Sequence, residues 1–478
     1  MMEQIPLFIG GVWRNTHPSE SIPVINPATE DQIGLIAKAS LADIEDAAIA
    51  AEKGFATWKQ VSALDRASIM HKAANLIRER AENIALVLTA EHGKPLAEAM
   101  GEVAATADTI DWHAEEGRRA YGRVIPSRAL GIHQFTLMEP IGPVVGFAPW
   151  NFPLIQAVKK VAGALAAGCS IILKGATEAP SCAVELVKAF ADAGVSPGAV
   201  NLLFGDSGQI SEHLIAHPSI RKVTFTGSTP VGKKLASLAG LHMKRSTMEL
   251  GGHAPVIVMD DADIATAVKI SVAAKYRNAG QVCVSPTRFI VHSKVFDEFV
   301  SRFVEGARAI KVGDGLDPNV TMGPMAHAGR LKATEELVAD AVSHGAKLEI
   351  GGNRVGNKGY FFEPTVLTNV PVTARAMVDE PFGPIALINS FDDIEDAIKE
   401  ANRLPYGLSA YAYTRSLTSA NKLFNGIESG AISINHHSVA LPEHPFGGVK
   451  DSGYGTEGGP GALDAFMTTK FVSLASVL

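Results

Sequence analysis

Hydrophobic and polar positions along the first part of the chain follow the spacing of amphipathic helices. From about Leu41 to residue 120, apolar side chains recur every three or four positions with charged residues between them. From Pro143 the pattern changes, and short apolar runs alternate with longer segments of helical spacing. The short runs, which predict buried strands, are PVVGFAP, SIILKG, AVNLLFG and KVTFTGS. Strands that alternate with helices in this way indicate a parallel sheet covered on both faces.

A second alternating block extends from about Pro255 to Asn435 and predicts a second α/β domain. Residues 123–142 and 466–478 also have strand-like character, but they lie outside both blocks. An exposed terminal strand usually pairs with another strand, so we expect this part of the chain to contact a second subunit. In parallel sheets, ligands bind where the carboxyl ends of strands meet the amino ends of helices, so we expect the functional residues of this chain at those ends.

Composition narrows the class of protein. A chain of 478 residues is too long for one small core and predicts two or three domains. A net charge of -7 without a basic block, together with 6% aromatic residues, argues against a nucleic-acid partner. The first residues lack the pattern of a secretory signal, and the longest nearly uncharged apolar run is shorter than a membrane span. With three cysteines and no disulfide framework, we expect a cytoplasmic protein.

One of the three cysteines stands apart from the others. Cys169 and Cys182 lie in apolar segments of the kind that hold buried structural cysteines. Cys283 instead lies in NAGQVCVSPTR, between a Gly-Gln pair and a Ser-Pro turn, and this predicts a loop. A lone cysteine is more often structural than reactive, and a reactive thiol needs a reachable, electropositive site. The case for Cys283 therefore depends on its neighbours in the fold.

Two polar residues at predicted strand ends are candidates for those neighbours. Glu249 precedes two glycines in MELGGHAP, where it is either a solvated strand terminus or a carboxylate that activates water beside a cysteine nucleophile. Asn151 lies between two prolines in APWNFP, where it is either an ordinary turn residue or a fixed amide donor for a developing oxyanion.

Six motifs together carry a resemblance to a known family. PWNFP, FTGS, ELGG, GQVC, EPFGP and PFGGVKDSG occur in the order and at roughly the spacing of the aldehyde dehydrogenase superfamily, and the likeness covers essentially the whole chain. Within the superfamily, the chain is most similar to succinate-semialdehyde dehydrogenases. The resemblance implies that Cys283 is the nucleophile, Glu249 the general base and Asn151 the oxyanion donor, with no metal ion.

The resemblance also implies a fold and a division of the chain. The expected fold is the α/β aldehyde dehydrogenase-like fold, with a Rossmann-type parallel-sheet cofactor domain, a second α/β catalytic domain and a small β oligomerisation element. The bounds are 1–118 and 140–250 for the cofactor domain, 251–432 for the catalytic domain, and 119–139 and 458–478 for the oligomerisation strands. A homodimer or homotetramer is expected.

The implied reaction is the NAD(P)-dependent oxidation of an aldehyde to its carboxylic acid. The Cys283 thiolate attacks the aldehyde to give a thiohemiacetal, whose hydride passes to the nicotinamide cofactor. Glu249 then activates a water molecule that hydrolyses the resulting thioester.

The cofactor is expected to bind without the usual dinucleotide fingerprint, since no Gly-x-Gly-x-x-Gly follows the first strand. By resemblance, Gly227 and Ser228 begin a helix beside the pyrophosphate, Glu380 with Phe382 contacts the nicotinamide ribose, and Trp150 and the Leu250 backbone line the nicotinamide end.

The residues expected to contact the adenosine end of the cofactor predict whether the protein prefers NADP or NAD. Relatives usually carry Lys-Pro-x-Glu here, whereas this chain has Lys174, Gly175, Ala176 and Thr177. A carboxylate at the last position binds a free 2′-hydroxyl and repels a 2′-phosphate. Its absence, with the charge of Lys174, favours NADP over NAD. Glu178, one residue on, is able to take the vacated place, and NAD stays open as the alternative.

The substrate prediction rests on two cations. Arg277 lies six residues before Cys283, where succinate-semialdehyde dehydrogenases carry an arginine that binds the distal carboxylate. A second arginine is expected on the helix after PWNFP, and this chain has Lys159 there. Phe446 is expected to wall the tunnel. These residues predict succinate semialdehyde or a similar carboxylate-bearing semialdehyde, although the lysine and the absence of a second cysteine in CVS depart from the pattern.

Other functions stay open at this point. They are a general NAD-dependent aldehyde dehydrogenase of another substrate range, a coenzyme A-acylating relative, a non-redox cysteine hydrolase, and a binding protein on an enzyme scaffold. A coenzyme A-acylating enzyme would lack the water-activating carboxylate that Glu249 supplies, and intact Cys283, Glu249 and Asn151 disfavour the binding protein.

Overall fold

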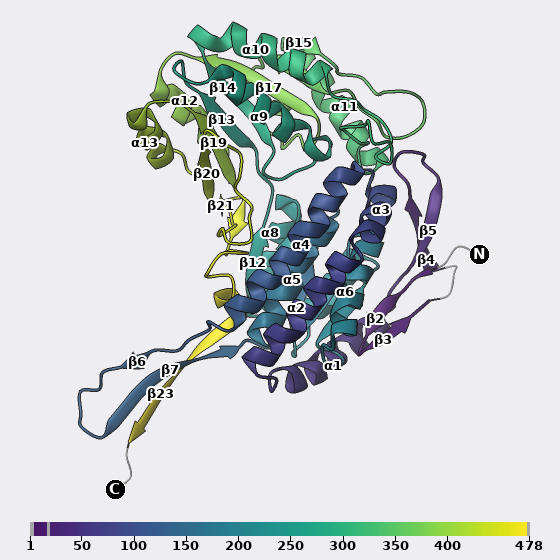
Figure 1. Ribbon diagram of the computed structural model, residues 1–478, viewed down its shortest axis with the longest axis vertical. Coiled ribbons are helices and arrows are strands. Elements are labelled where there is room, and N and C mark those ends of the chain that lie inside the picture. Colours follow the sequence, from purple (N-terminus) through teal and green to yellow (C-terminus); the bar gives the residue numbers. More distant parts are fainter. Residues whose placement is uncertain (1–3, 17–19, 476–478) are drawn as a thin grey trace.

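The computed structural model describes residues 4–16 and 20–475. Figure 1 shows two α/β parts, one above the other in this view, and a long narrow arm that projects from the lower part. Each α/β part is built on its own sheet, with helices packed against it. The α/β class predicted from the alternating pattern is confirmed.

The first sheet has the strand order β22-β12-β11-β8-β9-β10-β2-β3, and its five central strands are parallel. The four strands predicted from apolar runs after Pro143 are all present in it. Two short amino-terminal strands and one carboxyl-terminal strand join it as antiparallel edges. The strands are β2 (Leu7–Ile9), β3 (Val12–Arg14), β8 (Val144–Phe147), β9 (Ile171–Lys174), β10 (Val200–Leu203), β11 (Lys222–Thr226), β12 (Arg245–Glu249) and β22 (Gly453–Tyr454).

Helices cover this sheet and account for the helical pattern that begins near Leu41. Trp58, at the end of the first helix, is fully buried, and its indole N–H donates to the Leu165 carbonyl over 2.9 Å. The helices are α1 (Leu41–Trp58), α2 (Ala63–Glu79), α3 (Ala81–His92), α4 (Leu96–Gly117), α5 (Pro153–Ala167), α6 (Pro180–Ala193), α7 (Ser207–Ala216) and α8 (Thr229–Leu241). A separate small sheet is formed by β1 (Gln4–Ile5), β4 (Ser21–Ile25) and β5 (Gln32–Ala37).

The second sheet has the order β15-β16-β17-β14-β13-β19-β20, and all its strand pairs are parallel except β15 with β16. It corresponds to the second alternating block of the sequence. Its strands are β13 (Ala254–Val258), β14 (Pro286–His292), β15 (Lys347–Ile350), β16 (Thr365–Thr368), β17 (Ile385–Phe391), β19 (Ser409–Tyr413) and β20 (Ala431–Ile434). Its helices are α9 (Ile264–Tyr276), α10 (Ser293–Arg308), α11 (Ala328–Ser343), α12 (Ile394–Ala401) and α13 (Leu417–Gly426).

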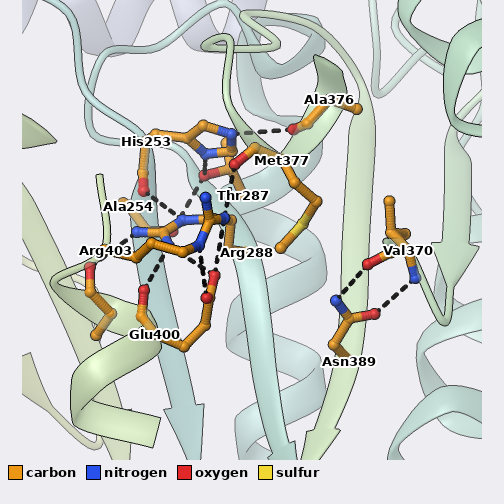
Figure 2. A network of polar contacts seen from close by, with 11 residues as sticks. His253, Ala254, Thr287, Arg288, Val370, Ala376, Met377, Asn389, Glu400 and Arg403 are labelled. Carbon is orange, nitrogen blue, oxygen red and sulfur yellow. Dashed lines mark hydrogen bonds and ion pairs between the residues drawn. The ribbon is translucent and has the colours of Figure 1, made fainter. Parts of the chain in front are cut away.

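The buried Arg288 connects α12 to His253, which immediately precedes β13, the first strand of this sheet in chain order (Figure 2). Arg288 donates from Nε to the His253 carbonyl over 3.1 Å and from its two terminal nitrogens to the Glu400 and Ala401 carbonyls over 2.8 and 3.0 Å. Burial lowers the pKa of Arg288 to about 10, so the guanidinium keeps its charge at neutral pH. Because His253 directly follows the Gly251-Gly252 link from the first sheet, these bonds fix where the chain crosses between the two sheets.

The arm consists of β6 (Val124–Ile125), β7 (Ile132–Pro140) and β23 (Met467–Ala475), in the order β23-β7-β6 (Figure 1). Strands β7 and β23 pair antiparallel along their whole length, so the terminal strand finds its first partner within the chain. Within the described residues β23 is an edge strand, and Phe471 and Leu474 on it are each 57% exposed. Residues 1–3, 17–19 and 476–478, which belong to the predicted cofactor domain and oligomerisation strands, lie outside the described residues.

Along residues 4–16 and 20–475, no helix combines the length and the hydrophobicity needed to cross a lipid bilayer.

Close packing of α1 on the first sheet depends on a glycine, which gives a stability prediction. A Cβ atom at Gly54 would lie 2.1 Å from the Gly198 carbonyl carbon, so Gly54→Ala must push α1 away from the sheet. We expect it to lower the free energy of unfolding by at least about 1–3 kcal/mol. Gly101→Ala in α4 is the matched control, because its Cβ meets no atom within 4 Å and helix propensity favours alanine. The measurement is the thermal unfolding midpoint of each variant, and equal midpoints would contradict the packing.

Candidate active site

Two cavities meet at Cys283. The first has a volume of about 350 Å³ and lies at the carboxyl end of the first sheet, with Thr226, Gly227 and Leu250 in its wall. The second has a volume of about 330 Å³ and is lined by residues of α4, α5 and the segment that contains Phe446. Cys283 belongs to both walls and is partly exposed, whereas Cys169 and Cys182 are buried. The thiol is thus reachable from two sides.

The loop that carries Cys283 has a strained backbone. After α9 ends, Asn278 and Ala279 adopt φ of 51° and 53°, and Gly280 adopts φ of 72°. A Cβ atom at Gly280 would lie 2.1 Å from the Gly383 carbonyl oxygen, so only glycine fits there. Left-handed conformations at non-glycine residues cost about 1–3 kcal/mol each and persist only where the surroundings hold them.

Hydrogen bonds from other elements hold this loop in place. The Asn278 backbone N–H donates to Glu98 Oε2 over 2.9 Å, and the Tyr411 hydroxyl donates to the Val284 carbonyl over 2.7 Å. The Gln281 side-chain carbonyl accepts from the Ala326 backbone N–H over 2.9 Å. The nucleophile candidate is therefore fixed on both sides by α4, the second sheet and the segment before α11.

Asn151 lies beside the cysteine loop and lines the first cavity with Cys283. Its side-chain Nδ2 donates to the Gln281 carbonyl over 3.2 Å, which uses one of the two amide N–H groups. Its backbone carbonyl accepts from Asn278 Nδ2 and from Lys94 Nζ, both over 2.9 Å. Asn151 thus has its backbone and its side chain both bonded, and one side-chain N–H remains for a ligand.

A buried ion pair between Lys94 and Glu102 supports this arrangement. This pair was not predicted from the sequence. Lys94 Nζ lies 2.6 Å from Glu102 Oε2, and both side chains are essentially inaccessible. Glu102 Oε1 accepts from the Leu154 and Ile155 backbone N–H groups over 2.9 and 3.2 Å, at the start of α5. The only sequence signal is a Gly-Lys-Pro turn between two helical segments, which by itself predicts no contact with a distant loop.

Glu249 ends β12 and is almost completely buried. Neither carboxyl oxygen has a hydrogen-bond partner among the described residues, and Glu249 is not part of either cavity wall. Burial, reinforced by the charge of Glu457, raises its pKa well above the ordinary value, while Lys159 and Lys160 oppose the shift. Both carboxyl oxygens therefore keep lone pairs that no described residue occupies.

The thiol of Cys283 is neutral at neutral pH. Burial raises its pKa to about 12, and the charges of Glu380 and Glu249 add to the effect. Lys159 and the Val284 backbone N–H act in the opposite direction. Since the thiolate is the nucleophilic form, attack requires that the proton leave or that positive charge be added nearby.

The first cavity collects six of the ten residues expected to contact the cofactor. Ser228 is the N-cap residue of α8, and its side chain makes no capping bond, so backbone N–H groups of the first helical turn are free for an anion. Glu380 accepts from the Gly252 backbone N–H over 3.1 Å, and burial raises its pKa to about 7. The donor set fits a dinucleotide phosphate. The six residues are Trp150, Gly227, Ser228, Leu250, Glu380 and Phe382.

The remaining four, Lys174, Gly175, Ala176 and Thr177, do not line this cavity. They lie at and just beyond the carboxyl end of β9, the neighbour of β8 in the same sheet. Burial lowers the pKa of Lys174, while Glu178 and Asp206 oppose the shift. The Thr177 hydroxyl donates to Glu178 Oε2 over 3.2 Å.

The three residues expected to contact the substrate all line the second cavity. Lys159 Nζ lies 4.0 Å from the ring centroid of Phe446, and the Arg277 guanidinium lies 5.1 Å from that of Phe152. Within the part of the chain that the structure describes, neither cation has an ion-pair partner or a side-chain hydrogen bond. The cavity therefore presents two basic side chains without an ion-pair partner, beside the carboxyls of Glu98 and Glu102. Burial lowers the pKa of Lys159, while Glu457 and Glu249 oppose the shift.

Some residues of the two walls were not anticipated from the sequence. Arg330 donates from Nη2 to the Pro381 and Phe382 carbonyls over 2.6 and 3.2 Å and so supports the segment with Glu380. Tyr406 also lines the first cavity, and Gln156 lines the second. No motif singles these residues out, because each reaches its cavity from an otherwise ordinary helix or strand.

Known proteins resemble this chain over nearly its full length. The family model described as "Aldehyde dehydrogenase family" matches residues 13–472. A relative named putative 4-(hydroxymethyl)benzenesulfonate dehydrogenase, from Comamonas testosteroni, is 45% identical over 98% of this chain and 97% of its own. A 3-sulfolactaldehyde dehydrogenase from Pseudomonas putida is 39% identical over 98% and 97%. The crystal structure of a succinate-semialdehyde dehydrogenase from Burkholderia pseudomallei has a TM-score of 0.97 at 38% identity, covering 99% and 98%.

The pKa of Cys283 gives a prediction for chemical labelling. Iodoacetamide should modify Cys283 alone in the folded protein, because the other two cysteines are buried. A pKa raised to about 12 means that the reactive thiolate increases with pH, so the labelling rate should rise about tenfold per pH unit from 7 to 9 without a plateau. Intact-mass spectrometry after timed labelling measures this. Cys283→Ala should take up no label until it is unfolded, and a plateau near pH 7 would show that the thiol pKa is lowered instead.

Proposed function

Because the chain belongs to the aldehyde dehydrogenase family, we propose that it oxidises an aldehyde to the carboxylic acid through a thioester on Cys283. The observation that carries this proposal is the position of Cys283 on the walls of two cavities. One cavity has the donors for a dinucleotide phosphate, and the other has two unpaired cations. A nicotinamide cofactor, when bound, accepts the hydride of the aldehyde carbon.

Asn151 supports the first covalent step. When the Cys283 sulfur bonds to the aldehyde carbon, the carbonyl oxygen becomes an oxyanion that needs fixed donors. The second N–H of the Asn151 side chain and the Cys283 backbone N–H are available for it. The two bonds to the Asn151 carbonyl hold the residue so that little reorganisation accompanies the step.

Glu249 is the proposed general base for hydrolysis of the thioester. Only the ionised carboxylate accepts a proton from water, and burial raises the pKa of Glu249 and so opposes that form. Lys159 and Lys160 both stabilise its charged form. A water molecule between Glu249 and Cys283 would occupy the free lone pairs of the carboxyl and lie in position to attack the thioester carbon.

The substrate class follows from the second cavity. Lys159 and Arg277 favour an aldehyde whose far end carries an anionic group, since both cations are otherwise unpaired and partly enclosed. Succinate semialdehyde or a similar carboxylate-bearing semialdehyde is the substrate predicted from the sequence. The similarity to a succinate-semialdehyde dehydrogenase structure supports this class.

NADP is the proposed cofactor, with NAD as the alternative. Thr177 has no charge to repel a 2′-phosphate, and Lys174 supplies a positive group at the same strand end. The hydroxyl of Thr177 donates a hydrogen bond to the Glu178 carboxylate. Glu178, the carboxylate able to bind the ribose 2′-hydroxyl in place of the missing glutamate, is therefore already hydrogen-bonded.

The proposal also assigns the parts of the chain. Residues 1–118 and 140–250 would bind the cofactor, 251–432 would carry the nucleophile, and 119–139 with 458–478 would join subunits into a homodimer or homotetramer. The exposed apolar residues on the edge strand β23 support a subunit contact at the arm. The protein is proposed to act in the cytoplasm.

A matched pair of aldehydes tests the function. Succinate semialdehyde and butanal have the same length and differ in the terminal carboxylate, so we expect kcat/KM to be about 10- to 100-fold higher for succinate semialdehyde if Lys159 and Arg277 bind its charge. NAD(P)H formation is followed by absorbance. Cys283→Ala should lose at least about 1,000-fold in kcat with either aldehyde.

Cys182→Ala is the control, since that cysteine lies outside both cavities. Turnover retained by Cys283→Ala would remove the nucleophile assignment, and equal use of both aldehydes would remove the acid-binding role of the second cavity.

Cofactor preference is tested at one position. Thr177→Glu restores a carboxylate that repels a 2′-phosphate, so the ratio of kcat/KM with NADP to that with NAD should fall about tenfold or more. Thr177→Gln, which is similar in size but neutral, is the control and should change the ratio much less. An unchanged ratio in Thr177→Glu would reject the phosphate argument.

A further inference from the structure

The second cavity contains a buried amide without a partner. Gln156 lies on α5, is 5% exposed and belongs to the cavity wall. Its side-chain oxygen is fully buried and has no hydrogen-bond partner, and no bond from its amide nitrogen is found within the described residues. The side-chain oxygen is an acceptor, and only the amide N–H groups are able to donate to a ligand. Buried amides in folded proteins are nearly always bonded, so these free N–H groups beside a cavity call for an acceptor from the ligand.

Gln156 and Lys159 share one face of α5, because they are three residues apart on the helix. Phe152, one turn earlier on the same face, carries the Arg277 guanidinium against its ring. An amide, an ammonium and a guanidinium therefore surround a single cavity.

Other charged groups near the cavity are already engaged. Lys160, next to Lys159 in the chain, lies 2.7 Å from Glu457 and donates to the Thr226 hydroxyl over 2.6 Å. Glu102 is paired with Lys94. Glu98 accepts from the Asn278 backbone N–H over 2.9 Å, and burial raises its pKa. The groups left for a bound anion are Gln156, Lys159 and Arg277.

The number of donors distinguishes between acid groups. A carboxylate presents two oxygens in one plane, and two cations satisfy it. A sulfonate presents three oxygens in a tetrahedral arrangement and keeps its charge at every physiological pH. A third donor that carries no charge matches the third oxygen.

We propose that the side-chain N–H of Gln156 donates to the third oxygen of a sulfonate whose other oxygens contact Lys159 and Arg277, and that the preferred substrate is an aldehyde with a sulfonate at its far end. This inference rests on the proposed function and narrows its substrate class. The names of two relatives, a benzenesulfonate dehydrogenase and a sulfolactaldehyde dehydrogenase, agree with it.

The experiment compares acids that differ only in the anionic group. The pairs are 3-sulfopropanal with succinate semialdehyde, and 4-formylbenzenesulfonate with 4-formylbenzoate. The protein should favour the sulfonate at least about tenfold in kcat/KM within one pair or both. Gln156→Met, which keeps the length but removes the amide, should lower kcat/KM for that sulfonate about 10- to 100-fold and for its carboxylate partner less than threefold.

The loss in Gln156→Met should appear chiefly in KM, because the contact is made both before and during the reaction. Gln60→Met, at an exposed position outside both cavities, is the matched control and should leave the ratio within each pair unchanged. A binding measurement keeps the proposal testable should Gln156→Met fail to fold. Propane-1-sulfonate should protect Cys283 of the unmodified protein from iodoacetamide at least tenfold more strongly than butyrate does.

Equal or stronger use of the carboxylate in both pairs, or equal losses for both acids in Gln156→Met, would overturn this inference and leave the proposed function intact. If none of the aldehydes, charged or neutral, supports NAD(P)H formation, the proposed function fails, and the inference fails with it.

Discussion

The backbone carbonyl of Asn151 joins three separate parts of the chain at the candidate nucleophile. It accepts hydrogen bonds from Lys94, which precedes α4, and from Asn278, which belongs to the strained loop before Cys283. The Asn151 side chain completes the connection by donating to Gln281. If this group of bonds were lost, the amide would no longer be fixed relative to the thiol, and the two cavities would no longer share a defined wall.

This connection requires a buried ion pair. Removing Lys94 and Glu102 from water costs several kcal/mol per charge, and their mutual attraction repays it only because further bonds satisfy the remaining atoms. Glu102 receives two backbone N–H groups of α5, and the Lys94 ammonium also lies 4.1 Å from the Phe152 ring centroid. The pair is therefore better explained as a device that sets geometry than as a source of stability. It fixes the start of α5, and with it the face that holds Gln156 and Lys159.

Patterns that repeat along the chain were the most readily predicted from the sequence. The alternation of apolar runs and helical segments indicated both sheets, because strand and helix periods are local properties. The order of six motifs, through the resemblance to a known family, indicated Cys283, Asn151 and six residues that line the first cavity. The Lys94–Glu102 pair and the unpaired amide of Gln156 could not be predicted. Their significance depends on contacts between distant elements, and their sequence surroundings are those of ordinary helices.

The charge of the second cavity links substrate binding to the reactivity of the thiol. Lys159 lowers the pKa of Cys283, and an anion held by Lys159 alone would cancel that help and leave the thiol more firmly protonated. Arg277 lines the same cavity and is able to share the charge of a bound anion. When two basic side chains share this charge, less of it opposes the effect of Lys159 on the thiol. In the proposed arrangement, Gln156 would add a contact to the anion without adding charge beside the thiol.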